Sequence, residues 1–187
     1  MKEIRIHGRG GQGNVKLAEI IAIAAFEDGK SPQAFPSFGV ERRGAPVTAF
    51  VKIDNKFIRS REQVYHPDYL IIQDPSILGV ENVFAGCKKN TVIIINSDKS
   101  PKALCPGVSY KVICMPANEI SLKIIGKPIT NTALLGAFAA YYKFSTKSLE
   151  KAIKINLGER LDKEIIDKNI KAMHEAYDWV KKNYKLD

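Results

Sequence analysis

Apolar positions along this chain follow two periods, and the change from one to the other predicts the order of its elements. Short apolar or alternating runs bounded by turn residues are typical of strands. The predicted strands are residues 3–7, 46–53, 56–60, 69–73, 91–96 and 110–115. Apolar residues at spacings of three and four are typical of helices. The predicted helices are residues 14–28, 76–85, 117–125, 132–143, 146–156 and 161–184.

This order of elements predicts the fold class. Strands interleaved with helices are typical of an α/β domain. Residues 70–72 and 92–95 are apolar without interruption, as in strands that are covered on both faces. The chain shows no repeat and no linker. We therefore expect one three-layer α/β/α domain over residues 1–187, with a mostly parallel (mixed) sheet and an early β-hairpin.

The hairpin is expected in the first third of the chain. Asp54-Asn55 is a tight-turn pair, so it predicts pairing between residues 46–53 and 56–60. Residues 30–39 are interrupted by two prolines and lack the alternation of a strand. We therefore expect no strand there.

Composition excludes several classes of protein. No apolar run approaches the length of a membrane span, and the N-terminus lacks the layout of a signal peptide, so we expect a cytoplasmic protein. Cys87, Cys105 and Cys114 are scattered and odd in number. They predict neither a disulfide framework nor a zinc or iron–sulfur site, and we expect this chain to hold no metal.

The net charge of +9 is distributed unevenly by residue type. The 22 lysines are spread over the whole chain, whereas six of the seven arginines lie in the first 61 residues. Arginine is favoured where carboxylate or phosphate is bound through planar, bidentate contacts, so these residues predict the functional region. A basic surface also suits nucleic acid, but the chain carries no recognition helix, zinc finger or RNA-binding motif.

A glycine loop, Gly8-Arg9-Gly10-Gly11-Gln12-Gly13, lies between the first predicted strand and the first predicted helix. The start of a helix behind such a loop is suited to anions. A dinucleotide fold needs a second strand that ends in an acidic residue about 20 residues further on. Here the helix closes at Glu27-Asp28-Gly29 and the irregular stretch follows. The loop therefore does not predict NAD or FAD binding.

A second loop, residues 37–46, carries Glu41, Arg42 and Arg43 between Gly39 and Gly44. Its side chains suit ionic hydrogen bonds to a ligand or partner, or an internal pair between Glu41 and an arginine. The glycine loop together with residues 33–46 resembles the gamma subunit of 2-oxoacid:ferredoxin oxidoreductases. The further matching blocks are residues 58–59, 67–70, 73–75 and 131–136.

The resemblance covers nearly the full chain, and the arginine pair followed by Gly44-Ala45-Pro46 resembles the pyruvate (or 2-ketoisovalerate) type. It implies a reaction of 2-oxoacid, coenzyme A and oxidised ferredoxin to acyl-coenzyme A, carbon dioxide and reduced ferredoxin. It also implies alpha, beta and delta-type partner subunits, and ferredoxin through the complex. Membrane and nucleic acid are not implied as partners.

The cofactors of the family are thiamine diphosphate, magnesium and iron–sulfur clusters. This chain has no Gly-Asp-Gly with a later Asn-Asn and no clustered cysteines. We therefore expect the cofactors in partner subunits, coenzyme A as a co-substrate, and no catalytic residue in this chain. The alternative of a different class is a stand-alone nucleotide- or nucleic-acid-binding α/β protein that uses the glycine loop and the basic surface.

The candidate site residues serve either of two roles. Arginines and a helix N-terminus suit the polyanionic end of coenzyme A, but the same groups suit an acidic surface of the catalytic subunit. The candidates are Arg9, Gly10, Gly11, Gln12, Gly13, Arg42 and Arg43. Asp74 follows a strand end, where α/β sheets face ligands, and Thr130, Asn131 and Thr132 are expected to cap a helix.

Overall fold

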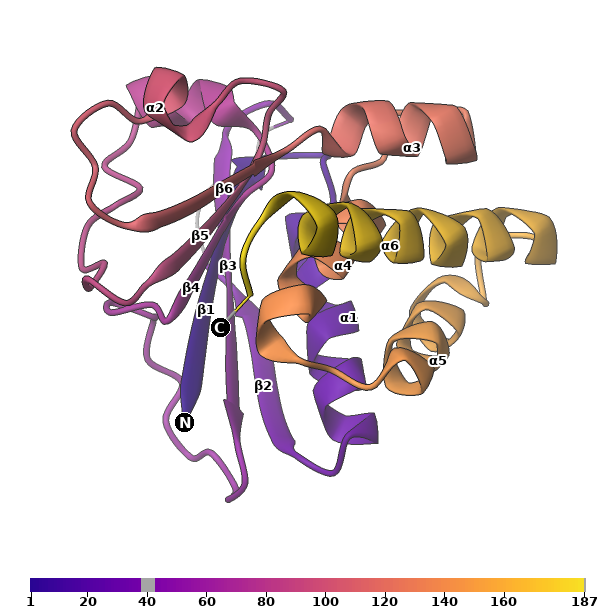
Figure 1. Cartoon of the computed structure of the whole chain (residues 1–187). Helices are drawn as coiled ribbons and strands as arrows, with labels where there is room; N and C mark the ends of the chain where they lie inside the picture. Colours follow the sequence, from indigo (N-terminus) through magenta and orange to yellow (C-terminus); the bar gives the residue numbers. More distant parts are fainter. Residues whose placement is uncertain (38–42, 187) are drawn as a thin grey trace.

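The computed structural model describes residues 1–37 and 43–186, and within them it contains a six-stranded sheet of order β2-β3-β1-β4-β5-β6 (Figure 1). The strands are β1 (Lys2–Arg9), β2 (Ser31–Pro36), β3 (Pro46–Asp54), β4 (Tyr69–Ile72), β5 (Val92–Asn96) and β6 (Lys111–Met115). Strands β1, β4, β5 and β6 are parallel, whereas β3 pairs antiparallel with both β1 and β2. The sheet is therefore mixed and mostly parallel, as the sequence predicts.

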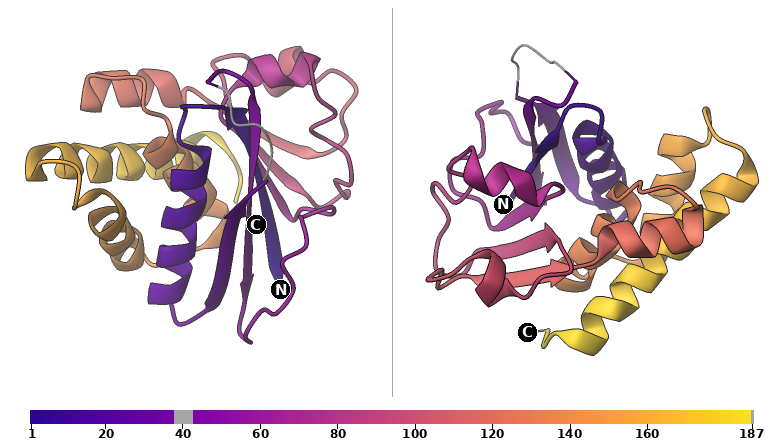
Figure 2. Two further views of the ribbon diagram at one scale, coloured as in Figure 1. Left: turned by 180° about the vertical axis from the view of Figure 1, so that it is seen from behind. Right: turned by 90° about the horizontal axis from the view of Figure 1, so that it is seen from above.

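Helices cover the two faces of the sheet unequally. Longer helices gather on one face, and a short 3-10 helix, η1, and the short α2 lie with irregular segments on the other (Figures 1 and 2). We call these the helical face and the irregular face. The helices are α1 (Asn14–Glu27), η1 (Pro75–Gly79), α2 (Pro101–Leu104), α3 (Ala117–Ile125), α4 (Asn131–Tyr142), α5 (Thr146–Leu157) and α6 (Lys163–Asn183). No helix in the described ranges is long and apolar enough to cross a membrane.

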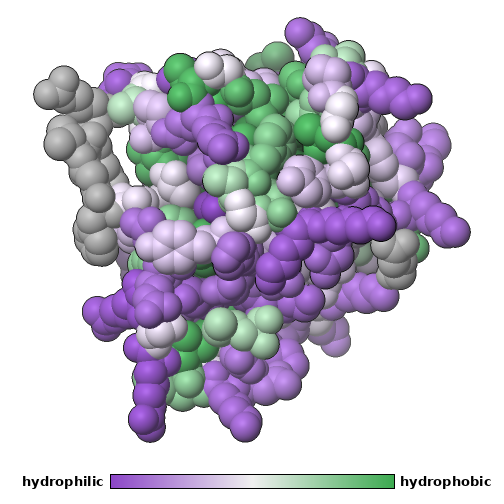
Figure 3. All heavy atoms as spheres, turned by 90° about the vertical axis from the view of Figure 1, so that its left-hand side faces the viewer, coloured by the Kyte–Doolittle hydropathy of each residue, from purple (hydrophilic) through white to green (hydrophobic). Residues whose placement is uncertain are grey.

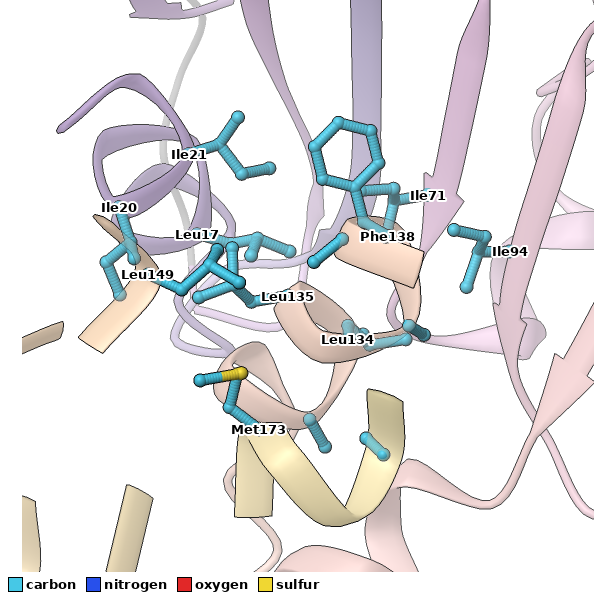
Figure 4. Close-up of a cluster of buried hydrophobic side chains, with 14 of the residues drawn as sticks. Leu17, Ile20, Ile21, Ile71, Ile94, Leu134, Leu135, Phe138, Leu149 and Met173 are labelled. Carbon is cyan, nitrogen blue, oxygen red and sulfur yellow. The ribbon is translucent and has the colours of Figure 1, made fainter. Parts of the chain in front are cut away.

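Each central strand sends alternate side chains to opposite faces. Ile71 and Ile94 join the large core of the helical face, and Leu70 and Ile93 join a smaller core of the irregular face. Because both faces are covered, these strands need apolar residues at every position. Figure 4 shows the large core, in which Phe138 of α4 lies close to β4. The result confirms the three-layer α/β prediction, with a thin and irregular third layer.

The predicted hairpin is wrong in one of its strands. β3 pairs with β2 along residues 31–36, so the stretch expected to be irregular is a strand, and residues 56–60 form none. Prolines 32 and 36 are tolerated because β2 lies at the edge of the sheet. All six residues of β2 are half-buried, which removes the alternation that identifies a strand in sequence.

The predicted helix 76–85 is also wrong beyond its first turn. Only the five residues of η1 are helical, and the chain then continues in turns. Nη2 of Arg5 in β1 donates hydrogen bonds to the carbonyl oxygens of Val83 and Ala85, at 2.9 and 2.6 Å. In a longer helix these carbonyl oxygens would accept hydrogen bonds from N–H groups of the helix itself. The buried arginine therefore favours the turns seen after Gly79.

Both edges of the sheet are modified against further pairing. At β2, prolines 32 and 36 lack the N–H that another strand would need. At β6, the Tyr184 hydroxyl donates to the carbonyl oxygen of Cys114 at 2.9 Å and accepts from its N–H at 3.0 Å. Residues that follow α6 therefore occupy the edge at Cys114.

Gly136 lets α4 and α6 approach closely. A Cβ atom added to Gly136 would lie 2.0 Å from the carbonyl oxygen of Met173 and 2.9 Å from its carbonyl carbon. This obstacle is backbone, which a rotamer change cannot move. Residues 131–140 of α4 are all buried, so α4 cannot retreat without opening the large core.

We predict that Gly136→Ala lowers the free energy of unfolding by about 2 kcal/mol or more, because overpacking of a close helix contact forces the backbones apart. Gly79→Ala is the matched control, since a Cβ at Gly79 meets nothing within 4 Å. Urea unfolding of the two variants measures the difference. Equal stability of both variants would contradict the role of Gly136.

Candidate functional site

A crevice forms where the loops of two neighbouring parallel strands leave in opposite directions. The chain leaves β1 towards α1 on the helical face, and it leaves the adjacent β4 towards η1 on the irregular face (Figure 1). In open α/β sheets, ligands bind at the carboxyl ends of the strands at such a point. The glycine loop and Asp74 lie on the two sides of this crevice.

The two loops singled out in the sequence lie against each other. Gly10 donates its N–H to the carbonyl oxygen of Ala45 at 2.8 Å, and Gly44 donates to the carbonyl oxygen of Gly10 at 3.1 Å. These bonds continue the ladder between β1 and β3, which ends with Arg9 opposite Pro46. The structure thus brings Gly10 and the region of Arg43 together, whereas Arg42 lies outside the described residues.

Arg9 joins three segments rather than pointing freely into solvent. Its Nε and Nη2 donate to the Ser76 hydroxyl at 2.9 and 2.8 Å, and its Nη1 donates to the carbonyl oxygen of Gly44 at 2.9 Å. Its Nε also lies 3.5 Å from the Asp74 carboxylate. Arg9 therefore ties the glycine loop to the second loop and to η1.

A hydrogen bond between the side chains of Gln12 and Asp74 spans the crevice. The Gln12 amide donates to Oδ2 of Asp74 at 2.7 Å, and the N–H of Ser76 donates to Oδ1 at 2.9 Å. Partial burial opposes ionisation of Asp74, but hydrogen bonds from Ser76 and Gln12 outweigh it and lower the pKa of this carboxyl below its usual range. Asp74 is therefore a carboxylate at neutral pH and holds Gln12 in place.

A buried network of amide side chains lies beneath the crevice, centred on Gln73. The Gln73 amide donates to Oδ1 of Asn14 at 2.6 Å and accepts from the Thr130 hydroxyl at 3.2 Å. Its backbone carbonyl accepts from the Asn96 amide at 2.9 Å. Gln73 is 2% exposed, so these bonds replace water. One residue thus connects the ends of β4 and β5 to the starts of α1 and α4.

The network extends to the glycine loop through Asn14. A Cβ atom added to Gly8 would lie 2.2 Å from Oδ1 of Asn14, so glycine is needed at this position for the amide to reach Gln73. Asn14 also donates to the carbonyl oxygen of Val47 at 3.1 Å. The first glycine of the loop therefore serves internal packing rather than a ligand.

One hollow of about 500 Å³ opens between the glycine loop and the start of α1. Its lining residues are Arg9, Gly10, Gly11, Gly13, Asn14, Val15, Lys16, Arg43 and Val47. Helix α1 begins after Gly13 without a side-chain cap and without an acidic residue in its first turn. Arg43 is exposed beside it. Three cationic residues, Arg9, Lys16 and Arg43, and the positive end of a helix therefore line one hollow, a setting that favours anions.

A second hollow of about 420 Å³ lies on the other side of Gln12. Its lining residues are Gly11, Gln12, Gln73, Asp74, Pro75, Asn96, Asn118, Pro128, Ile129 and Thr130. Polar amide and hydroxyl groups form its floor. A ligand that hydrogen-bonds through uncharged groups would fit this hollow, whereas a phosphate would fit the first.

Sequence reasoning missed Asn14, Lys16, Gln73 and Asn96 as site residues. Asn14 begins α1, Lys16 lies in its first turn, Gln73 directly follows β4 and Asn96 ends β5. These positions at strand ends and helix starts were the available signal. Thr130 lies at the N-cap position of α4 as expected, but its hydroxyl makes no cap hydrogen bond and donates to Gln73 instead. The side chain of Asn131 accepts from the N–H of Thr132. Of the other candidates, Gly11 and Gly13 line the first hollow, and Gly11 and Gln12 line the second.

His7 is close to the crevice, but its charge is suppressed. It is 7% exposed, and burial together with the positive charge of Arg5 lowers its pKa to about 4. At neutral pH its ring is therefore uncharged, and its 3.5 Å contact with the Glu81 carboxylate is not an ion pair. In the described part of the chain, no group of three or more His, Cys, Asp or Glu residues could hold a metal ion.

We predict that Gln73→Ala lowers the free energy of unfolding by about 2–4 kcal/mol, because it leaves buried partners unpaired and opens a cavity. Gln63→Ala is the matched control, because Gln63 is exposed in an irregular segment. Thermal and urea unfolding would reveal the difference. If Gln73→Ala unfolded at the same urea concentration as the control, the network would not support the site.

The amino-acid sequence of this chain matches a known protein family over most of its length. Residues 3–179 match the model of the pyruvate ferredoxin/flavodoxin oxidoreductase family. Pyruvate synthase subunit PorC of Methanosarcina barkeri is 52% identical over 155 residues, which are 82% of this chain and 85% of the relative. The pyruvate/ketoisovalerate oxidoreductases common subunit gamma of Pyrococcus furiosus is 48% identical over 182 residues, 95% of this chain and 96% of the relative.

Solved structures agree with the sequence comparisons. The pyruvate oxidoreductase subunit PORC of Thermotoga maritima is 30% identical, with a TM-score of 0.82 over 95% of both chains. A 2-oxoglutarate:ferredoxin oxidoreductase of Magnetococcus marinus has a TM-score of 0.78 at 19% identity and shares the fold, over 100% of this chain and 32% of that one. The chain described here belongs to the pyruvate ferredoxin/flavodoxin oxidoreductase family.

Proposed function

We propose that this chain is the gamma subunit of a pyruvate-type 2-oxoacid:ferredoxin oxidoreductase. The observation that carries the proposal is the end-to-end likeness to subunits named for pyruvate synthase and pyruvate/ketoisovalerate oxidoreductases. The assembled enzyme would convert a 2-oxoacid and coenzyme A to acyl-coenzyme A and carbon dioxide, with electrons passing to ferredoxin. Within it, this chain supports assembly and positions a ligand.

The proposal assigns the redox and carbon–carbon chemistry to partner subunits of alpha, beta and delta type. Such chemistry belongs to thiamine diphosphate with magnesium and to iron–sulfur clusters. An iron–sulfur cluster needs several cysteine thiolates at one place, and the described residues contain no group of three or more His, Cys, Asp or Glu side chains that could hold a metal ion. We place the complex in the cytoplasm, with ferredoxin as its electron acceptor.

The hollow at the start of α1 is the proposed position of the coenzyme A phosphates. Arg9 is occupied by Ser76 and Gly44, so the groups left to meet an anion are Arg43, Lys16 and the first N–H groups of α1. Lys16 already contacts the Glu19 carboxylate at 2.7 Å, which leaves Arg43 as the principal contact. Arg42, next to it in sequence, shares this proposed role.

The competing role uses the same residues as a dock for an acidic surface of the catalytic subunit. An exposed arginine such as Arg43, beside the ordered backbone of the glycine loop, suits either partner. The two roles differ in what the loss of Arg43 changes: affinity for coenzyme A in one, and subunit assembly in the other.

The function as a whole is tested by purification from the native host. An antibody to this untagged chain is expected to recover a complex that contains thiamine diphosphate and iron–sulfur clusters and that reduces ferredoxin with pyruvate and coenzyme A. Recovery of a monomer that binds nucleotide or nucleic acid would contradict the proposal and support the stand-alone alternative.

The coenzyme A role predicts that Arg43→Ala raises the KM for coenzyme A of the assembled complex about tenfold, as expected for about 1.4 kcal/mol of lost binding. Arg43→Lys should recover part of this loss, and Lys147→Ala, an exposed change on α5, should leave it unchanged. Steady-state kinetics with saturating 2-oxoacid measures the effect. An unchanged KM for coenzyme A together with weaker subunit assembly would contradict the coenzyme A role and support the docking role.

A further inference from the structure

The irregular face carries an exposed segment that is part neither of the crevice nor of the proposed coenzyme A site. Residues 57–65, here called the strap, connect β3 to β4 without regular structure. The strap exposes two aromatic side chains, Phe57 at 81% and Tyr65 at 64%. It also exposes Arg59 and Arg61. Figure 3 looks onto this side of the molecule, where hydrophilic side chains project from the lower half and hydrophobic residues lie among them.

Two buried cations of the sheet anchor the strap. Arg5 of β1 is 8% exposed and donates from Nη1 to the carbonyl oxygen of Val64 at 3.2 Å. Lys52 of β3 is 2% exposed, and its Nζ lies 3.4 Å from the Ser60 hydroxyl and 3.6 Å from the Glu3 carboxylate. Val64 itself is buried. The strap is thus fastened at two points, four residues apart.

This anchoring presents the exposed residues in one arrangement. A segment that is ordered before it binds avoids much of the entropy loss of association. Between and beside the two anchor points, Arg59, Arg61 and Tyr65 face solvent. Tyrosine and arginine are enriched among the residues that dominate protein–protein binding energies, and exposed phenylalanine adds apolar area.

The charge of the strap indicates the chemistry of its partner. Arg59 and Arg61 carry two positive charges against the one carboxylate of Glu62, and Lys56 adjoins them. Among the described residues, the carboxylate of Glu3 beneath the strap is already paired with Lys52 and is not left to neutralise these arginines. Arginine binds carboxylate through two parallel hydrogen bonds.

We propose that the strap is a docking surface for an acidic face of another subunit of the same oxidoreductase. The inference rests on the proposed function. Arg59 and Arg61 meet carboxylates of the partner, while Phe57 and Tyr65 pack into apolar depressions beside them. The surface lies on the irregular face, so it leaves the crevice and the helical face to other contacts.

The test compares two charge reversals of equal size in the full-length chain. Arg59→Glu/Arg61→Glu changes the strap, and Lys147→Glu/Lys154→Glu changes exposed positions of α5 on the helical face. Each variant replaces the native chain in the host, the complex is recovered through a tag on a partner subunit, and the amount of this chain per complex is measured. Circular dichroism of each isolated variant confirms folding.

We expect the strap reversal to reduce the recovered chain about tenfold and the α5 reversal to leave it unchanged. Phe57→Ser/Tyr65→Ser should also reduce recovery, at unchanged net charge. Recovery of wild-type complex should fall between 0.1 and 1 M salt, where the screening length drops from about 10 to about 3 Å. If the strap reversal fails to fold, Arg59→Gln/Arg61→Gln takes its place with the same expectation.

Two results would overturn the inference while the proposed function stands. In the first, the wild type and the strap reversal are recovered equally. In the second, the strap and α5 reversals reduce recovery equally, so that only overall charge matters. If the wild-type chain itself is absent from the complex, the proposed function fails and the inference fails with it.

Discussion

The side chain of Gln73 is the point on which the geometry of the candidate site depends. Gln73 directly follows β4; its side-chain amide donates to Asn14 and accepts from Thr130, and its backbone carbonyl accepts from the Asn96 amide. An amide can do this because it donates and accepts at once. Since every partner is buried, the network either forms completely or leaves polar groups unsatisfied. The starts of α1 and α4 are thereby fixed relative to the sheet, and the glycine loop is fixed with them.

The sequence predicted the layers and the β6 edge of the sheet well, and the β2 edge poorly. β4 and β5 are recognisable because burial on both faces demands uninterrupted apolar residues. β2 is hidden because an edge strand tolerates Pro32 and Pro36 and shows no alternation. Residues 56–60 follow a tight-turn pair, as the second strand of a hairpin would, yet Phe57 is exposed and no neighbour pairs with these residues in the described chain. A turn signal records a local preference, whereas a strand also needs a partner with free backbone groups.

The candidate site was found only in part, for a related reason. The glycine and arginine loops were visible as motifs, and the structure brings Gly10 to Ala45 through the backbone. The polar floor was not visible, because Asn14, Gln73 and Asn96 meet only after the order of strands is known. Arg9 shows what residue type alone leaves out: it suggested a ligand contact, and the structure adds that the guanidinium bonds to Ser76 and Gly44 within the chain.

The hydroxyl of Tyr184 on Cys114 has a bearing on how this protein can be joined to others. The edge of an open sheet offers unpaired backbone groups, so another chain with an extended segment can add a strand to it. On the β6 side one phenol group occupies the backbone groups of Cys114 without adding a strand, and on the β2 side two prolines lack the N–H that a further strand would need. Contacts with other proteins therefore depend less on backbone pairing, which any extended chain can make, and more on side chains, which distinguish one partner from another.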